Sequence, residues 1–174
     1  MRKNIRIILW SIAIVFLIAE IVFVNFFGKK NITTGAAEGE RLNDFSITCT
    51  DGKDFNLSEQ NGKVVVINLW ATWCIPCVDE LPNFEKISEE FPDEVSVIAI
   101  HSTPVTTDVA EWLSDYSYTI PFAVDEDGSV SGLLNVSAVL PQTVVIDKDG
   151  IITYNKPGSL TYDELRDIVS RALS

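Results

Sequence analysis

The sequence predicts an α/β domain, with a central mixed sheet flanked by helices, that follows a single transmembrane helix. Largely apolar runs, such as residues 64–67 and 95–100, alternate with segments whose apolar residues have helical spacing. This alternation is typical of strands that helices cover on both faces. Two cysteines, Cys74 and Cys77, stand where the first run passes into such a segment, and residues 7–27 are almost wholly apolar. We therefore expect one folded domain and one membrane segment.

The N-terminal apolar stretch has the length of a membrane span. At about 1.5 Å per residue, its roughly twenty residues cross the apolar core of a bilayer, although Glu20 lies within it. A cleaved signal peptide is the alternative, but the stretch is long for one and no small-x-small cleavage site ends it. We expect an uncleaved anchor at residues 1–30, a small polar linker at 31–40 and the folded domain at 41–174.

Basic residues near the N-terminus predict the orientation of this anchor. Arg2, Lys3 and Arg6 precede the apolar stretch, as is usual on the cytoplasmic side, although Lys29 and Lys30 at the other end weaken the bias. The chain is therefore expected in the cell membrane as a single-pass protein, with a cytoplasmic N-terminus and an extracytoplasmic domain. Disulfides persist in that compartment.

The domain is strongly acidic. From residue 31 onward the chain carries 24 acidic and 8 basic residues, and the net charge of the whole chain is −12. Lys and Arg do not cluster in this part of the sequence, so we expect no nucleic-acid partner.

Turn dipeptides and capping patterns divide the domain into elements. Asp-Gly occurs twice between strand-like segments, which predicts two hairpins, and two capping boxes mark helix starts. The predicted elements are a hairpin at 45–50 and 54–57, strands at 64–69 and 95–100 with a helix carrying Leu81, Phe84 and Ile87 between them, a helix at 108–115, a short strand at 122–124, a short helix at 129–134, a hairpin at 144–147 and 151–154, and a last helix that Thr161 and Glu164 open. Strands and helices thus alternate, as in two-sided sheets.

The cysteine pair indicates a redox centre. Cysteines three residues apart lie on one face of a helix and can close a small disulfide ring. Cys74 would lie at the helix N-terminus, where unpaired N–H groups and the helix dipole favour a thiolate, and Cys77 would lie one turn further in and resolve a mixed disulfide. Two buried structural cysteines, or half of a zinc site, are the alternatives. A zinc site needs about two more ligands, and only Cys49 and His101 remain, so we expect no metal and no cofactor.

The same segment resembles a known family. Trp73-Cys74-x-x-Cys77-x-x-Glu80-x-Pro82 matches every fixed position of the motif of the TlpA/ResA family of membrane-anchored thioredoxin-like proteins. The resemblance extends from about residue 41 to the C-terminus. It implies a thioredoxin fold with an N-terminal β-hairpin and a β-α insertion, and it implies extracytoplasmic thiol–disulfide exchange.

The resemblance also implies a proton-handling role for Glu80. Thioredoxin has a buried acid at the position of Asn68, and Glu80, three residues past Cys77 on the same helix face, could take over its role. An ordinary exposed helix acid, as assumed for Asp79, is the alternative.

A substrate-binding surface is implied by the same comparison. In thioredoxin-like folds a cis-proline faces the cysteine pair, and Pro141 stands at that point, with Leu140 offering backbone groups to an extended substrate segment. A trans proline that opens a strand is the alternative. Trp73, Ile75 and Pro76 are expected to contact the substrate as well.

The implied partners are exported proteins with thiols or disulfides. The family usually reduces its substrates, which suggests apocytochrome c during cytochrome c maturation, or another secreted thiol protein, with electrons supplied by a membrane thiol-electron transporter. Two alternatives share the fold. A peroxiredoxin-type thiol peroxidase needs a P-x-x-x-T-x-x-C pattern that Cys74 lacks, and a copper metallochaperone typically has C-x-x-x-C with a distal histidine, for which only His101 is present. We interpret Cys49 as a small packed residue rather than a second redox site or an intermolecular link.

Overall fold

The computed structural model describes residues 33–102, 105, 107–136 and 139–174, together with residues 10, 14, 15 and 17–19. The chain divides into two compact units, Met1–Ile32 and Thr33–Ser174. Within the residues described, no helix combines the length and the hydrophobicity that a membrane crossing requires. The predicted anchor at residues 1–30 lies largely outside those residues. Both cysteines of the motif belong to the second unit.

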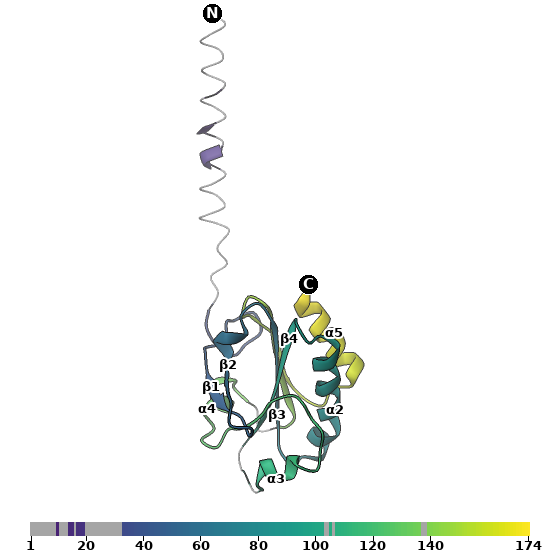
Figure 1. The fold of residues 1–174 in the computed structure, drawn as a ribbon. Coiled ribbons are helices and arrows are strands. Elements are labelled where there is room, and N and C mark those ends of the chain that lie inside the picture. Colours follow the sequence, from purple (N-terminus) through teal and green to yellow (C-terminus); the bar gives the residue numbers. More distant parts are fainter. Residues whose placement is uncertain are drawn as a thin grey trace, which may run out of the picture. The chain divides into compact units, whose positions relative to one another are not determined.

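A mixed sheet of five strands, in the order β5-β4-β3-β6-β7, forms the centre of the second unit (Figure 1). The strands β3, β4 and β5 are parallel, and β6 and β7 are antiparallel to their neighbours. A separate antiparallel hairpin, β1-β2, precedes them. The elements are β1 (Ser46–Thr48), β2 (Asp54–Asn56), η1 (Leu57–Gln60), β3 (Val64–Trp70), α2 (Ile75–Glu90), β4 (Val95–His101), α3 (Val109–Leu113), β5 (Phe122–Val124), α4 (Ser129–Leu133), β6 (Gln142–Ile146), β7 (Ile152–Pro157) and α5 (Tyr162–Leu173). The predicted hairpin, mixed sheet and β-α insertion are thus confirmed, with bounds that agree to within a few residues.

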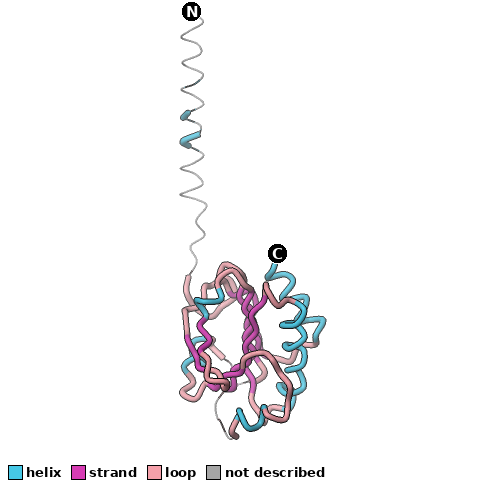
Figure 2. Tube along the Cα trace, viewed as in Figure 1, coloured by secondary structure: helices cyan, strands magenta, loops and turns pink. Residues whose placement is uncertain are grey.

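The central strand β3 is buried on both faces, which explains its apolar run. Val64, Val66 and Trp70 pack with α2 and α5, whereas Val65 and Ile67 pack with the hairpin and α4. Figures 1 and 2 show these two layers on opposite sides of the sheet. Because side chains alternate along a strand, the even-numbered positions of β3 all face α2. Position 68 therefore faces the helix that carries the second cysteine.

Helix α2 is held firmly against this sheet. Its residues Leu81, Phe84 and Ile87 are fully buried, at the spacing of one helical face. Pro76 occupies the first turn, where its missing N–H costs no intrahelical hydrogen bond. The predicted capping box of α5 is also present, with Thr161 and Glu164 bonding each other's backbone N–H groups. The N-terminus of α2, where the cysteines lie, is therefore a fixed point of the fold.

The predicted linker differs from the structure over residues 33–40. The Gly39 N–H donates to the Ile152 carbonyl at 2.8 Å, and the Ile152 N–H donates to the Glu40 carbonyl at 2.9 Å. Farther along β7, the Asn155 side-chain amide donates to the Ala36 carbonyl at 2.7 Å. Small polar residues are typical of tethers. Here, however, their backbone N–H and carbonyl groups form hydrogen bonds with residues of β7, so this segment is an ordered part of the domain.

Candidate active site

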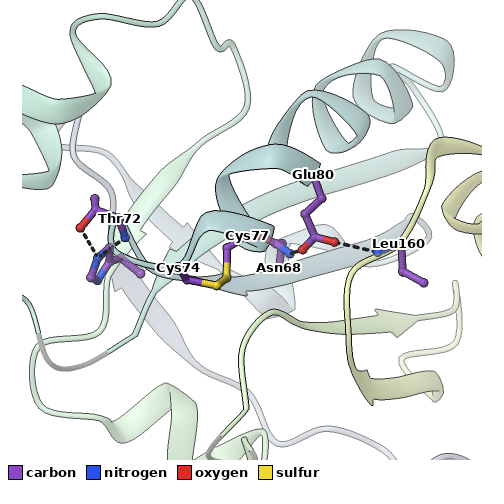
Figure 3. The surroundings of a disulfide bond; sticks show 7 residues. Asn68, Thr72, Cys74, Cys77, Glu80 and Leu160 are labelled. Atoms are coloured by element: carbon purple, nitrogen blue, oxygen red, sulfur yellow. Dashed lines mark hydrogen bonds between the residues drawn. A yellow bond between two sulfur atoms is a disulfide. The ribbon is translucent and has the colours of Figure 1, made fainter.

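A disulfide joins Cys74 and Cys77 at the start of α2 (Figure 3), with an S–S distance of 2.01 Å and a Cα–Cα distance of 5.3 Å. Cys74 is the N-cap of the helix and has an extended backbone. Its carbonyl accepts hydrogen bonds from the N–H groups of Cys77 at 3.0 Å and Val78 at 3.1 Å. The predicted disulfide therefore closes across the first helical turn, and Cys74 lies at the positive end of the helix dipole.

The two sulfur-bearing residues differ in exposure. Cys74 is 7% exposed, whereas Cys77 is fully buried. Trp73 and Ile75, on either side of Cys74, are 52% and 75% exposed. An incoming protein therefore reaches Cys74 first, within an apolar surround.

Glu80 lies near the disulfide, and its carboxyl group accepts two hydrogen bonds (Figure 3). The Asn68 side-chain amide donates to Oε1 at 2.8 Å, and the Leu160 N–H donates to Oε2, also at 2.8 Å. Asn68 and Glu80 are both buried. The alternative of an ordinary exposed acid is therefore wrong for Glu80, although it fits Asp79, which is exposed.

The environment of Glu80 brings its pKa close to neutrality. Burial raises the pKa of this carboxyl group from 4.5 to about 7, because a charge is costly away from water, and the hydrogen bonds from Leu160 and Asn68 oppose the rise. A group that titrates near the working pH can both take up and release a proton. Glu80 is thus chemically suited to exchange a proton with a nearby thiol.

The Leu140–Pro141 peptide bond is cis, as the resemblance implied. Pro141 is buried and its carbonyl accepts a hydrogen bond from the Gly158 N–H at 2.8 Å. Leu140 is half-buried, and Pro76 and Val139 are exposed. The substrate-binding roles of Trp73, Ile75, Pro76, Leu140 and Pro141 stay predictions.

His101 ends β4 and is fully buried. Its Nε2 accepts a hydrogen bond from the Thr72 N–H at 3.1 Å, and its ring contacts Trp70 edge-on with the centroids 5.2 Å apart. Its Nδ1 is buried and has no hydrogen-bond partner among the described residues. In the described part of the chain, no three metal-ligating side chains come together.

Cys49 is a buried free thiol. Its N–H donates to the Lys53 carbonyl at 2.7 Å in the turn between β1 and β2. Burial, followed by the nearby carboxylates Asp51 and Asp54, raises the pKa of this thiol. A buried thiol with a raised pKa is a poor nucleophile, in keeping with the interpretation of Cys49 as a packed residue.

Two contacts of the site could not be predicted from residue type, and both use backbone donors. The Leu160 N–H reaches Glu80, 80 residues away, and the Thr72 N–H reaches His101. Every non-proline residue has an N–H group, so residue type carried no signal. Only the order of the strands, which brings the end of β4 beside the end of β3, could have indicated the second contact.

Comparisons with known proteins agree with this geometry. The family model Redoxin matches residues 37–169. "Thioredoxin-like protein YneN" of Bacillus subtilis is 32% identical over 142 residues, which is 80% of this chain and 81% of that protein. "Thiol-disulfide oxidoreductase ResA" of Geobacillus kaustophilus is 29% identical over 169 residues, 95% of each chain.

Solved structures extend the likeness to the fold. The exposed lipoprotein thioredoxin Etrx1 of Streptococcus pneumoniae has a TM-score of 0.68 at 28% identity and covers 74% of this chain and 99% of its own. StoA of Bacillus subtilis has a TM-score of 0.63 at 22% identity, covering 72% of this chain and 96% of its own, and shows the fold alone. The thioredoxin fold is thereby confirmed.

Proposed function

Because the chain belongs to the Redoxin family and is a thioredoxin-like thiol–disulfide oxidoreductase of the ResA type, we propose that it reduces disulfides in exported proteins from a tether on the outer face of the cell membrane. The observation that carries the proposal is a disulfide at a helix N-terminus in which Cys74 is 7% exposed, between the exposed side chains of Trp73 and Ile75, and Cys77 is fully buried. This arrangement presents one sulfur to a protein partner and keeps the other for the second step.

The exchange takes place in two displacement steps. In the reduced protein the Cys74 thiolate attacks one sulfur of the substrate disulfide, forming a mixed disulfide and releasing the other substrate sulfur as a thiolate. Cys77 then loses its proton and attacks the Cys74 sulfur, which closes the protein disulfide and releases the second substrate sulfur as a thiolate. Two electrons pass to the substrate, and Glu80 receives the proton that Cys77 loses.

The exposed apolar side chains around Cys74 are suited to binding an extended segment of a substrate protein. We infer that Trp73 and Ile75 contact substrate side chains beside the reacting sulfur, together with Pro76. Leu140 offers its backbone to the substrate in the manner of an added strand, next to Pro141.

The substrate class follows from the resemblance. The proposed substrates are exported proteins with a reducible cysteine pair, such as the haem-binding cysteines of apocytochrome c, or another secreted thiol protein. Reducing equivalents return to the Cys74–Cys77 disulfide from a membrane thiol-electron transporter.

The reduction potential of the cysteine pair tests the proposed direction. We expect the full chain, equilibrated with glutathione buffers, to have a potential closer to the roughly −270 mV of thioredoxin than to the roughly −120 mV of a strong oxidant such as DsbA. The reduced chain should also reduce an oxidised Cys-x-x-Cys-His peptide, as followed by mass spectrometry, whereas a Cys49→Ala variant should behave like the wild type. A potential near −120 mV would instead identify the protein as an oxidant.

The proposed tether, residues 1–30, has its own test. In the native host the protein should stay in the membrane pellet after an alkaline carbonate wash, and its N-terminal sequence should begin within the first two residues. Protease added to intact spheroplasts should digest the domain at residues 33–174. A soluble product that begins beyond residue 30 would favour the cleaved signal peptide.

A further inference from the structure

His101 is a buried titratable residue that the exchange steps leave unused. It pairs in register with Trp70 of β3 and with Val124 of β5, at the ends of three parallel strands. Its ring is fully buried. Burying a polar group costs folding free energy unless the group forms hydrogen bonds inside the protein.

The hydrogen bond from Thr72 defines the protonation state of the ring. Nε2 lies 3.1 Å from the Thr72 N–H, which donates, and 3.4 Å from the Thr72 hydroxyl (dashed lines at Thr72 in Figure 3). A nitrogen that accepts an N–H carries no proton, so the imidazole is neutral and holds its proton on Nδ1, which is buried without a hydrogen-bond partner among the described residues. Burial lowers the pKa of His101, and the Ser102 backbone offsets part of this effect, which agrees with a neutral ring.

Thr72 lies in the turn that delivers the attacking cysteine. The Cys74 N–H donates to the Ala71 carbonyl at 3.0 Å, which closes a turn over residues 71–74 between β3 and α2. Trp73, inside this turn, is half exposed. The bond to His101 therefore ties the turn to the end of β4.

We propose that His101 is a positioning residue for thiol–disulfide exchange, which holds Thr72 through Nε2 and so fixes the turn that presents the Cys74 sulfur to substrates. The proposal rests on the proposed function, since it takes Cys74 as the attacking sulfur. His101 itself touches neither sulfur in this scheme.

The acidic groups on the surrounding elements are engaged elsewhere. The Asp125 carboxylate, after β5, accepts the N–H groups of Val130 and Ser131. The Glu80 carboxyl group on α2 is bonded by Asn68 and Leu160. On α3, Asp108 accepts the Glu111 N–H, and Glu111 is exposed. In the described residues His101 forms no ion pair, so its charge state follows the pH.

Protonation of His101 would release the turn. A protonated Nε2 can no longer accept the Thr72 N–H, although it can donate to the Thr72 hydroxyl. The exchange rate of the wild type should therefore fall in acid by more than the loss of Cys74 thiolate accounts for.

Two substitutions at position 101 separate positioning from packing. His101→Gln keeps an acceptor for the Thr72 N–H but does not titrate, whereas His101→Leu fills the space without an acceptor. The rate constant of the reduced full chain, in detergent, with glutathione disulfide is measured from about pH 7 down to the lowest pH at which the wild type stays folded. We expect His101→Leu to be about fivefold to tenfold slower at about pH 7, the factor that one lost hydrogen bond typically costs.

The glutamine variant gives the decisive comparison. His101→Gln should match the wild type at about pH 7 and exceed it once the pH falls below the lowered pKa of His101, since thiolate loss and Glu80 titration affect both proteins equally. A leucine variant as fast as the wild type, or a glutamine variant as slow as leucine, would overturn the proposal. If leucine does not fold, a ratio of glutamine to wild-type rates that stays flat over this whole pH range overturns it alone. A wild type that fails to react with glutathione disulfide contradicts the proposed function instead.

Discussion

Replacing Cys74 with alanine should abolish exchange with disulfide substrates, lowering the rate constant by about a thousandfold or more, as expected when a covalent nucleophile is removed. Cys77 cannot substitute for it, because Cys77 is fully buried and lies inside the first helical turn. The Cys77 sulfur would have to leave the protein core before it could reach a partner protein. Rates with a peptide disulfide, measured on the reduced full chain, check this expectation.

Replacing Cys77 with alanine should leave the first reaction step intact and block the second. Cys74 still attacks, but no second thiol resolves the product, so partner proteins accumulate as mixed disulfides on Cys74. Non-reducing gels and mass spectrometry of trapped adducts read out this result and also identify the substrates. Cys49→Ala is the matched control, since it removes a buried thiol outside the motif and should trap nothing. Equal trapping on Cys77 in a Cys74→Ala variant would reverse the assignment of the two roles.

The parts of this fold that could be predicted from sequence are those set by local patterns. The apolar run of β3 indicated burial on both faces, and the capping box at Thr161 indicated the start of α5. The Cys-x-x-Cys spacing placed Cys74 and Cys77 in one helical turn, because the helix geometry alone fixes that distance. These signals are short-range and depend on side-chain type.

The parts that could not be predicted depend on long-range contacts of backbone groups. Nothing in the residue type of Leu160 distinguishes the N–H that reaches Glu80. Residues 33–40 have the composition of a linker, yet their carbonyl and N–H groups bond to the domain through Ile152 and Asn155. Such contacts arise only when strand order brings distant segments together, and a single sequence does not record that order.

The Asn68–Glu80 pair shows what the departure from thioredoxin means physically. An amide at position 68 donates a hydrogen bond but does not titrate, so it contributes no charge of its own to the site. Glu80 is the acid that Asn68 touches, and its pKa is about 7. The titratable carboxyl group of this site thus lies on α2 rather than on β3.

Replacing Glu80 with glutamine should remove a pH dependence of stability in the oxidised protein. Burial raises the pKa of Glu80 to about 7, against 4.5 in the unfolded chain, so the folded state binds this proton more tightly. The stabilisation is fully present below about pH 4.5 and is lost as the pH rises through about 7. The shift corresponds to about 3 kcal/mol in the free energy of unfolding, which wild type should lose between about pH 4.5 and pH 8 and Glu80→Gln should keep.

Urea unfolding of both proteins across this range measures the difference in slope. A glutamine side chain can accept only one of the two hydrogen bonds, from Asn68 or from Leu160, which shifts its stability by an amount that does not vary with pH. The oxidised form is used so that Cys74 and Cys77 do not titrate, and any contribution from His101 is common to both proteins. Asp79→Asn, at an exposed neighbouring position, is the matched control and should keep the wild-type slope. Parallel curves for wild type and Glu80→Gln would show that Glu80 does not hold its proton near neutral pH, and would remove it as the proton acceptor for Cys77.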